Sequence, residues 1–269
     1  MRRYTSDGTF RDSLPAAPNV PTDRVRVGSD GRIWAWGGQV PDGLAVFDGT
    51  DWQAVAPYDH PGDYKVRDAA IAPDGAVWLG TELGALRRDA ATGEWTRHAS
   101  FQPISAVVPT PDGTVWLLKC DWLVQCDQKL IRLTPGGPRL YEESQVATLG
   151  EPLGNVLGAS YDGSGVWVVN SFGLARWDIA AANWTFYTPE TTNYAFPPEA
   201  ITEYDQAPDG TLWLAKAEDG LIRARPQSGE WHFAGNPLID GQYIDSVAVA
   251  GDGSVWASLR HEYAVYRCE

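Results

Sequence analysis

Six polar or charged side chains lie near the starts of short apolar segments in separate parts of the chain: Arg67, Asp68, Asn155, Glu203, Asp205 and Asp245. Calcium and magnesium prefer carboxylate oxygens, so Asp68, Glu203 and Asp245 could together hold such a cation. Alternatively, Arg67 or Arg24 pairs with these carboxylates around a water-filled channel, because a buried charge is costly unless it is paired. Both readings require the segments to converge.

A second set of candidates lies in loops that carry rings or histidine: Tyr58, His60, Tyr64, Trp122, Tyr194, Phe196, His261 and Tyr263. Rings beside carboxylates suit a sugar or a small cationic or aromatic ligand, and loop packing is the alternative. His60 and His261 are the candidate acid–base groups, with Glu262 beside His261. The sequence has no Gly-x-Ser-x-Gly, phosphate-binding or His-Glu-x-x-His motif.

The elements that would position these side chains come from a repeat, Asp-Gly-x-(apolar)-Trp. Its six copies end at Trp34, Trp78, Trp116, Trp167, Trp213 and Trp256, and the copy at Asp162 has one extra residue. Steps of 38 to 51 residues between these tryptophans are typical of propeller blades. Asp-Gly favours a tight hairpin because both residues tolerate positive φ, and the Trp would fill the space between sheets.

The repeat therefore predicts an all-β chain with almost no helix, forming one domain over residues 1–269. The expected fold is a six-bladed β-propeller of four-stranded antiparallel blades. Residues 8–11 resemble an outer strand without a blade of its own, so we expect the N-terminal strand to complete the C-terminal blade and close the ring. In the third blade, residues 139–141 are the expected outer strand. Ligands are expected at the end opposite the Asp-Gly turns, where Glu82, Asn170 and Glu218 also lie.

The composition of the chain limits the classes of partner that it could bind. A formal charge of −14 and a pI near 4.6 disfavour nucleic acid and anionic lipid, and no apolar run is long enough to span a bilayer. Met1-Arg2-Arg3 precedes no apolar segment, so no signal peptide is expected, and the chain is either cytoplasmic or extracytoplasmic with its leader removed. Cys120 and Cys126 could close a loop as a disulfide, leaving Cys268 over.

The run Gly173-Leu174-Ala175-Arg176-Trp177-Asp178, following an Asp-Gly-x-(apolar)-Trp element, resembles the two-component regulator propeller repeats of bacterial sensors. This resemblance covers the whole chain and implies a ligand-sensing propeller. The repeat is also similar to that of the seven-bladed streptogramin (virginiamycin B) lyases, which use a divalent metal with His and Glu to open a cyclic ester.

The leading hypothesis is a monomeric, non-catalytic propeller that binds a small molecule, glycan or protein on the loop face and needs no cofactor. One alternative is a metal-assisted lyase or hydrolase using His261, Glu262 and channel carboxylates, with calcium or magnesium as the metal. The other alternative is a structural subunit of a larger assembly. Propellers host unrelated functions, so the fold by itself does not choose among these.

Overall fold

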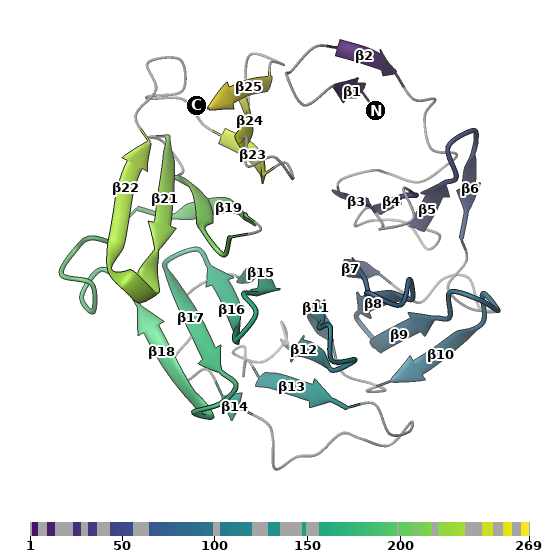
Figure 1. Ribbon diagram of the computed structural model, residues 1–269, viewed down its shortest axis with the longest axis horizontal. Helices are drawn as coiled ribbons and strands as arrows, with labels where there is room; N and C mark the ends of the chain where they lie inside the picture. The colour runs from purple at the N-terminus through teal and green to yellow at the C-terminus, as the bar shows by residue number, and fades with distance from the viewer. Residues whose placement is uncertain are drawn as a thin grey trace. The chain divides into compact units, whose positions relative to one another are not determined.

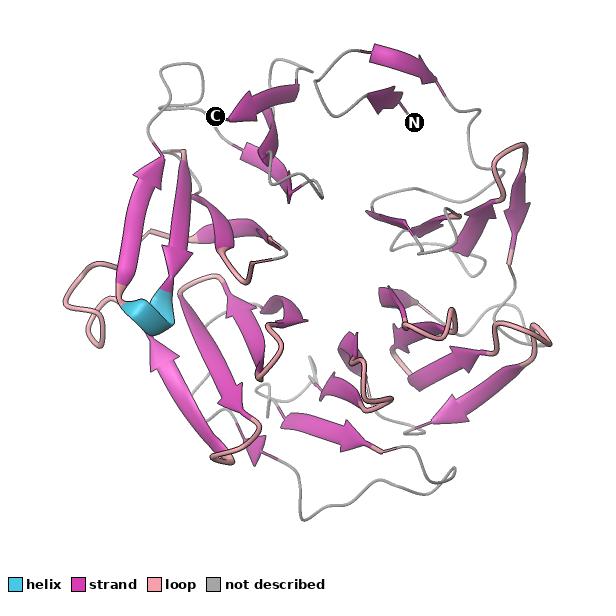
Figure 2. Ribbon diagram, in the orientation of Figure 1, coloured by secondary structure: helices cyan, strands magenta, loops and turns pink. Residues whose placement is uncertain are grey.

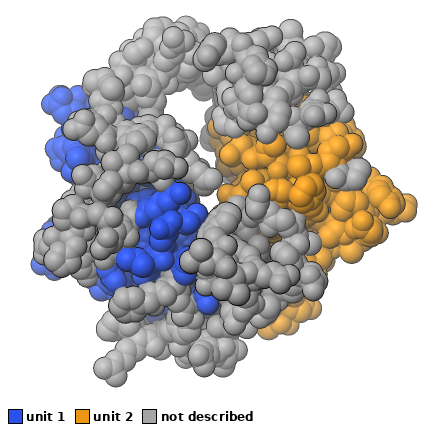
Figure 3. Space-filling model, turned by 180° about the vertical axis from the view of Figure 1, so that it is seen from behind, with its two compact units in different colours: residues 1, 13–152 blue, residues 2–12, 153–269 orange. Residues whose placement is uncertain are grey.

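The computed structural model describes residues 2–4, 10–13, 24–27, 32–36, 44–55, 65–98, 103–119, 129–134, 147–148, 156–197, 199–207, 209–216, 220–234, 244–249, 255–259 and 265–268. The chain divides into two compact units, one of residues 1 and 13–152 and one of residues 2–12 and 153–269 (Figure 3). Each unit is built from antiparallel sheets (Figure 1).

The first unit holds three four-stranded sheets. In each, strands follow one another in chain order and neighbours pair antiparallel. The strands are β3 (Arg24–Val27), β4 (Ile33–Trp36), β5 (Leu44–Phe47) and β6 (Trp52–Ala54); β7 (Val66–Ile71), β8 (Val77–Thr81), β9 (Gly84–Arg88) and β10 (Trp95–His98); and β11 (Ile104–Pro109), β12 (Val115–Lys119), β13 (Lys129–Leu133) and β14 (Ala147–Thr148).

Besides most of the two-stranded sheet of residues 2–4 and 10–13, the second unit holds two further four-stranded sheets and a three-stranded one. Their strands are β15 (Val156–Tyr161), β16 (Gly165–Asn170), β17 (Gly173–Asp178) and β18 (Asn183–Tyr187); β19 (Ile201–Gln206), β20 (Leu212–Lys216), β21 (Leu221–Arg225) and β22 (Glu230–Ala234); and β23 (Ile244–Val249), β24 (Val255–Leu259) and β25 (Val265–Cys268). One 3₁₀ turn, η2 (Pro226–Ser228), joins β21 to β22 (Figure 2).

The prediction of an all-β chain with almost no helix is confirmed. No helix in the described residues could cross a membrane. Ring closure is not seen: β2 (Phe10–Ser13) pairs with β1 (Arg2–Tyr4), and β23–β25 form three strands. In the third sheet Ala147–Thr148 pairs with β13, while residues 139–141 lie outside the described residues. Six blades and one domain stay predictions.

Each Asp-Gly turn combines a backbone device with a side-chain device. Gly75, Gly113, Gly163 and Gly210 have φ between +80° and +94°, a region that glycine enters at no steric cost. None of the four aspartates that precede these glycines has positive φ, so only the glycine of each turn adopts that region. Instead the Asp side chain accepts the N–H two residues on, as in Ala76 N–H to Asp74 Oδ1 at 3.0 Å.

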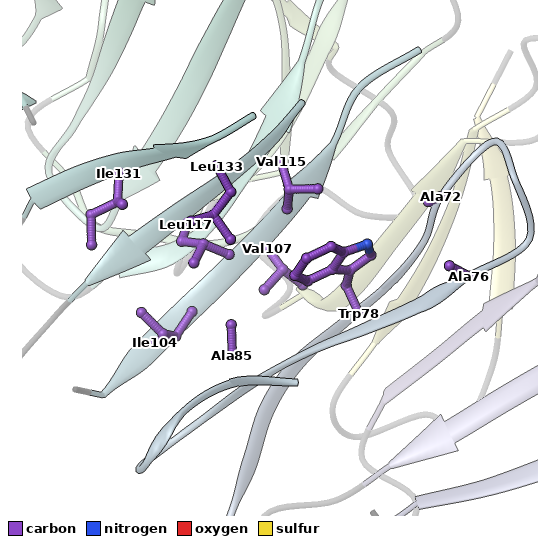
Figure 4. Close-up of a cluster of buried hydrophobic side chains, with 10 residues drawn as sticks. All are labelled: Ala72, Ala76, Trp78, Ala85, Ile104, Val107, Val115, Leu117, Ile131 and Leu133. Carbon is purple, nitrogen blue, oxygen red and sulfur yellow. The ribbon is translucent and has the colours of Figure 1, made fainter. Parts of the chain in front are cut away.

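The repeat tryptophans lie in the cores between sheets. Trp34, Trp78, Trp116 and Trp167 are buried, as predicted, and Trp213 is half-buried. In the first unit Trp78 packs with Val107, Leu117 and neighbouring apolar side chains of the next sheet (Figure 4). In the second unit Trp167 packs with Leu212 and Leu214 in the same way. Burying such rings is the main favourable contribution to sheet packing.

Five inner strands share a register shift near their starts. The shift falls between Val66 and Asp68, Ile104 and Ala106, Val156 and Gly158, Ile201 and Glu203, and Ile244 and Ser246. A β-bulge re-aims the side chains beside it. Arg67 and Asp245, two residues predicted to belong to a site, are the extra residues of two of these bulges.

Candidate functional site

The turn end of the sheets, meaning the end that carries the Asp-Gly turns, repeats one ionic arrangement. In β9 Arg87 donates from Nη2 to Asp74 Oδ2 of the turn at 3.1 Å and from Nη1 to Asp89 Oδ2 at 3.0 Å. In β17 Arg176 bridges Asp162 and Asp178 in the same way. The motif that resembles sensor propeller repeats thus places one guanidinium between two turn carboxylates.

The Arg176 copy is buried and densely bonded. Arg176 Nε donates to Asp162 Oδ2 at 2.7 Å, and Trp167 Nε1 donates to the same oxygen at 2.7 Å. The side chains of Arg176 and Asp162 are only 7% and 8% exposed. Burial raises the pKa of the Asp162 carboxyl, but hydrogen bonds from Arg176 and from the Ser164 N–H outweigh it and hold that pKa below its usual value.

Gly165 gives Arg176 its room. A Cβ at this position would lie 2.5 Å from Arg176 Cζ and 2.6 Å from the Trp177 carbonyl oxygen. Because Gly165 has no side chain, the copy with the extra residue has space for the buried guanidinium. The Arg176 Cζ lies 5.8 Å from the Trp167 ring centroid.

The sheet β19–β22 departs from this arrangement. In three other sheets an aspartate stands five residues after the glycine at or just before the start of the third strand: Asp48, Asp89 and Asp178. The residue at this place in β21 is Arg225. Arg225 forms an ion pair with Asp209 of its own turn, and its Nε donates to Thr211 Oγ1 at 2.9 Å. The turn that follows is η2, in which Pro226 is buried.

A pocket of about 450 Å³ opens beside Arg225, between the Asp-Gly turn of β15–β16, the Asp-Gly turn of β19–β20 and η2. It is lined by Asp162, Ser164, Trp167, Asp209, Gly210, Arg225, Pro226, Gln227 and Ser228. The comparable groove in the first unit, between the turns at Asp74 and Gly113, holds only about 130 Å³. The larger volume is in the range of small-molecule sites.

The loop end of the sheets, opposite the turns, presents rings instead of ion pairs. Three large hydrophobic side chains of the described residues stand out as exposed: Phe172 at 51%, Tyr194 at 65% and Phe233 at 56%. Phe172 lies in the β16–β17 hairpin, Tyr194 in the β18–β19 loop and Phe233 near the end of β22. All three belong to neighbouring sheets of the second unit, and we call this set the aromatic end.

The loop that carries Tyr194 is held by its own hydrogen bonds. The Tyr194 N–H donates to the Pro189 carbonyl at 2.6 Å, and the Phe196 N–H donates to Thr192 Oγ1 at 2.9 Å. Phe196 is fully buried and meets Trp231 edge-on at 5.7 Å between ring centroids. Tyr194 has φ of +62°, a strained value for a residue with a side chain. Figure 2 shows the loop in pink, beyond the end of β18.

A buried lysine joins this loop to β22. Lys216 Nζ lies 3.6 Å from Glu199 Oε2 and 5.3 Å from the centroid of the Phe233 ring. The Lys216 side chain is 5% exposed, whereas that of Glu199 is 54% exposed. The aromatic end therefore combines exposed rings with one cation and one anion.

The inner-strand carboxylates join neighbouring strands. The Val107 N–H of β11 donates to the buried Asp68 Oδ2 at 2.9 Å, and the Val249 N–H of β23 donates to Asp205 Oδ2 at 2.8 Å. Glu203 has the same place in β19 that Asp68 has in β7. Asp68 lies in the first unit, and Glu203 and Asp245 lie in the second.

Arg67 pairs with a carboxylate other than those expected. Its Nη2 donates to Glu82 Oε1 of the β8–β9 hairpin at 2.7 Å. Asn170, at the loop end of β16, is fully buried, and neither polar atom of its side chain has a hydrogen-bond partner in the described structure. Among the described residues, no three His, Cys, Asp or Glu side chains gather as metal ligands would.

Several predicted site residues lie outside the described residues: Tyr58, His60, Tyr64, Trp122, Asn155, Glu218, His261, Glu262 and Tyr263, together with Cys120 and Cys126. Asp245 is described as part of β23, without its side chain. Their roles, and the metal hypothesis for Asp68, Glu203 and Asp245, stay predictions.

Sequence reasoning missed Arg225, Gln227 and Phe233. The signal for Arg225 was present, because an Arg stands where three other copies of the repeat have Asp. Gln227 gave no signal, since its bond from Nε2 to Asp162 Oδ2 at 3.3 Å crosses between sheets that are far apart in sequence.

Comparison with known proteins places the chain by fold. No protein-family model matches it, and no curated protein matches its sequence. Its structure is similar to the extracellular domain of a hybrid two-component system from B. thetaiotaomicron, with a TM-score of 0.67, 15% identity, and coverage of 96% of this chain and 33% of that one. The chain thus spans about a third of the length of that extracellular domain.

Two other solved structures are similar over most of their lengths. A virginiamycin B lyase from Staphylococcus aureus, solved with quinupristin, has a TM-score of 0.68 at 12% identity, covering 91% of this chain and 82% of the lyase. YCF48 bound to D1 peptide has a TM-score of 0.64 at 16% identity, covering 95% and 84%. At such identities the likeness shows the fold, a β-propeller. The predicted resemblance to sensor propellers and streptogramin lyases is confirmed at that level.

Proposed function

We propose that this chain is a non-catalytic recognition propeller that binds a protein or glycan partner over the aromatic end. The observation that carries the proposal is the grouping of Phe172, Tyr194 and Phe233, exposed at one end of adjacent sheets. Rings of this kind supply contact area at low cost in side-chain entropy and are enriched at binding hot spots.

Rigidity supports the same proposal. The Tyr194 loop is anchored by Phe196 and by hydrogen bonds within residues 188–196, so ordering it on binding would cost little. Its strained backbone is of the kind that persists at functional sites. Glu199 and Lys216 would add polar contacts beside the rings, while the acidity of the chain disfavours anionic surfaces.

We also propose that six blades form one closed ring in which residues of the N-terminus complete the last blade. The grouping of residues 2–12 with residues 153–269 in one compact unit supports this arrangement. Closure would remove the free edge of the three-stranded sheet β23–β25.

The proposal is tested by affinity enrichment from the source organism with three baits: wild type, Tyr194→Ser/Phe233→Ser, and Glu230→Gln as a matched control on the exposed surface at the start of β22. Because Tyr194 and Phe233 are exposed, the double variant is expected to keep its thermal midpoint. We expect a specific set of partners that the control retains and the double variant loses. Equal recovery by all three baits, or recovery of none, would contradict the proposal.

The lyase alternative has its own assay. Quinupristin, the compound in the similar lyase structure, is incubated with the chain and Mg²⁺, and ring opening is followed by mass spectrometry. We expect no conversion. Metal-dependent opening that His261→Ala abolishes would replace recognition by catalysis. Stable co-purification with a fixed set of subunits, unaffected by the double variant, would favour the structural-subunit alternative.

A further inference from the structure

The pocket beside Arg225 lies apart from the aromatic end. The two features flank opposite ends of the same strands, since the 162–164 turn precedes β16 and the hairpin with Phe172 follows it. The pocket therefore needs an explanation of its own, independent of the proposed function.

The walls of the pocket are polar and electrically balanced. Asp162 is paired with Arg176, and Asp209 is paired with Arg225. The Thr211 N–H and hydroxyl hold the pKa of the Asp209 carboxyl below its usual value, with a further contribution from Arg225. Both aspartates are therefore ionised at neutral pH, each beside its arginine. A fully charged ligand would have to compete with one of these ion pairs, whereas a neutral ligand would not.

The remaining groups supply donors and acceptors in mixture. Arg225 donates from Nε to Thr211 and from Nη2 to Asp209, which leaves Nη1 available as a donor. Gln227 and Ser228 are exposed, and the Ser228 hydroxyl, which donates to the Arg225 carbonyl, can still accept. The Ser164 hydroxyl of the opposite turn donates to Asp162 and accepts from Arg176, which leaves it one acceptor position. Such a mixture matches the alternating donors and acceptors of a polyhydroxylated molecule.

The volume of the pocket and the change in the repeat at Arg225 also support a ligand-binding site. A pocket of about 450 Å³ exceeds the corresponding groove of about 130 Å³, and it accompanies the change from Asp to Arg225 at the end of the third strand. Trp167 at its base is buried under Arg176 and is not an exposed stacking platform. We propose that this pocket is a second binding site, which takes a neutral mono- or disaccharide through hydrogen bonds alone.

The test is isothermal titration calorimetry with glucose, galactose, N-acetylglucosamine, maltose and cellobiose, with sodium sulfate and sodium acetate as charged probes. We expect saturable binding of at least one sugar with a dissociation constant of about 1 mM or tighter, and none of the anions. Gln227→Ala and Arg225→Met should each weaken it by at least about tenfold. Glu230→Gln, an exposed change in β22 outside the pocket, is the matched control and should bind like wild type.

Two results would overturn the inference. One is the absence of saturable binding across the sugars, or binding of the anions in their place. The other is sugar binding that survives both pocket variants, which would put the sugar elsewhere. Gln227 is exposed, so its variant should fold, and a thermal melt confirms that the loss is local.

Discussion

The sheets β15–β18 and β19–β22 are built from the same repeat, but their Asp-Gly turns lie in different surroundings. In the first, Arg176 is buried between two carboxylates and its bonds join Asp162, Asp178 and Trp167. In the second, Arg225 replaces the third-strand aspartate and is 40% exposed, beside an Asp209 that is 56% exposed. The comparison shows that a change from Asp to Arg at one position of the repeat accompanies the replacement of a buried ion-pair network by an exposed ion pair that lines a pocket.

The largest effect is expected where the repeat is buried. Arg176→Met leaves the buried Asp162 without its cation and should cost about 3–5 kcal/mol of unfolding free energy. Arg87→Met removes the same repeat arginine in the first unit, where Asp74 is 59% exposed, and should cost at most about 1 kcal/mol. Urea denaturation of both variants measures the difference, and equal losses would refute the contrast between buried and exposed copies.

The inner-strand carboxylates should follow in size. Asp68→Ala leaves the Val107 N–H without its acceptor and should cost about 1–3 kcal/mol. Asp205→Ala removes a similar bond, to Val249, from a half-buried position and should cost less. Thermal melts with EDTA and with calcium test the alternative, since a calcium-dependent midpoint that Asp68→Ala abolishes would show that Asp68 binds metal.

Low pH should remove the contribution of Asp162 to the free energy of unfolding. Its folded pKa lies below the ordinary value of 3.8, so its contribution is complete above the unfolded pKa and is lost as pH falls through the folded one. The stability gap between wild type and Asp162→Asn, expected at about 1–3 kcal/mol at pH 7, should therefore shrink below about pH 4. Denaturation at pH 7, 5 and 3 measures it. A gap that stays constant to pH 3 would mean that the ionised carboxylate is not its source.

The smallest effect on stability is expected at Arg225. Arg225→Asp restores the residue type that three other copies have and gives up an exposed ion pair, so stability should change by no more than about 1 kcal/mol. Sugar binding at the pocket should be lost. A strongly destabilised Arg225→Asp would show that the guanidinium supports the turn and that the departure from the repeat is structural.

Most of the fold could be predicted from the repeat. Short-range signals, Asp-Gly turns and the following tryptophans, predicted the strands of the described sheets because they act within one hairpin. Ring closure stays a prediction, since among the described residues β2 is seen paired with β1 alone. Pairing between distant segments depends on contacts that a local pattern does not encode.

The candidate site was predictable only in part. Tyr194 was found from its place in a loop at the end opposite the turns, and it is exposed there. Arg67 and Asp68 were found from their polarity on an apolar strand, but the bulge between Val66 and Asp68 accompanies bonds to Glu82 and Val107 that spacing could not reveal. Phe233 was missed because it reads as an ordinary strand residue.

Site-specific photocrosslinking tests the central claim, recognition at the aromatic end, most directly. A photoreactive phenylalanine replaces Phe233 in one protein and the exposed Glu230 in another, and both are irradiated in the native host. The account predicts a discrete protein or glycan adduct at Phe233 that is absent at Glu230. No adduct at Phe233, or the same adducts at both positions, would contradict it.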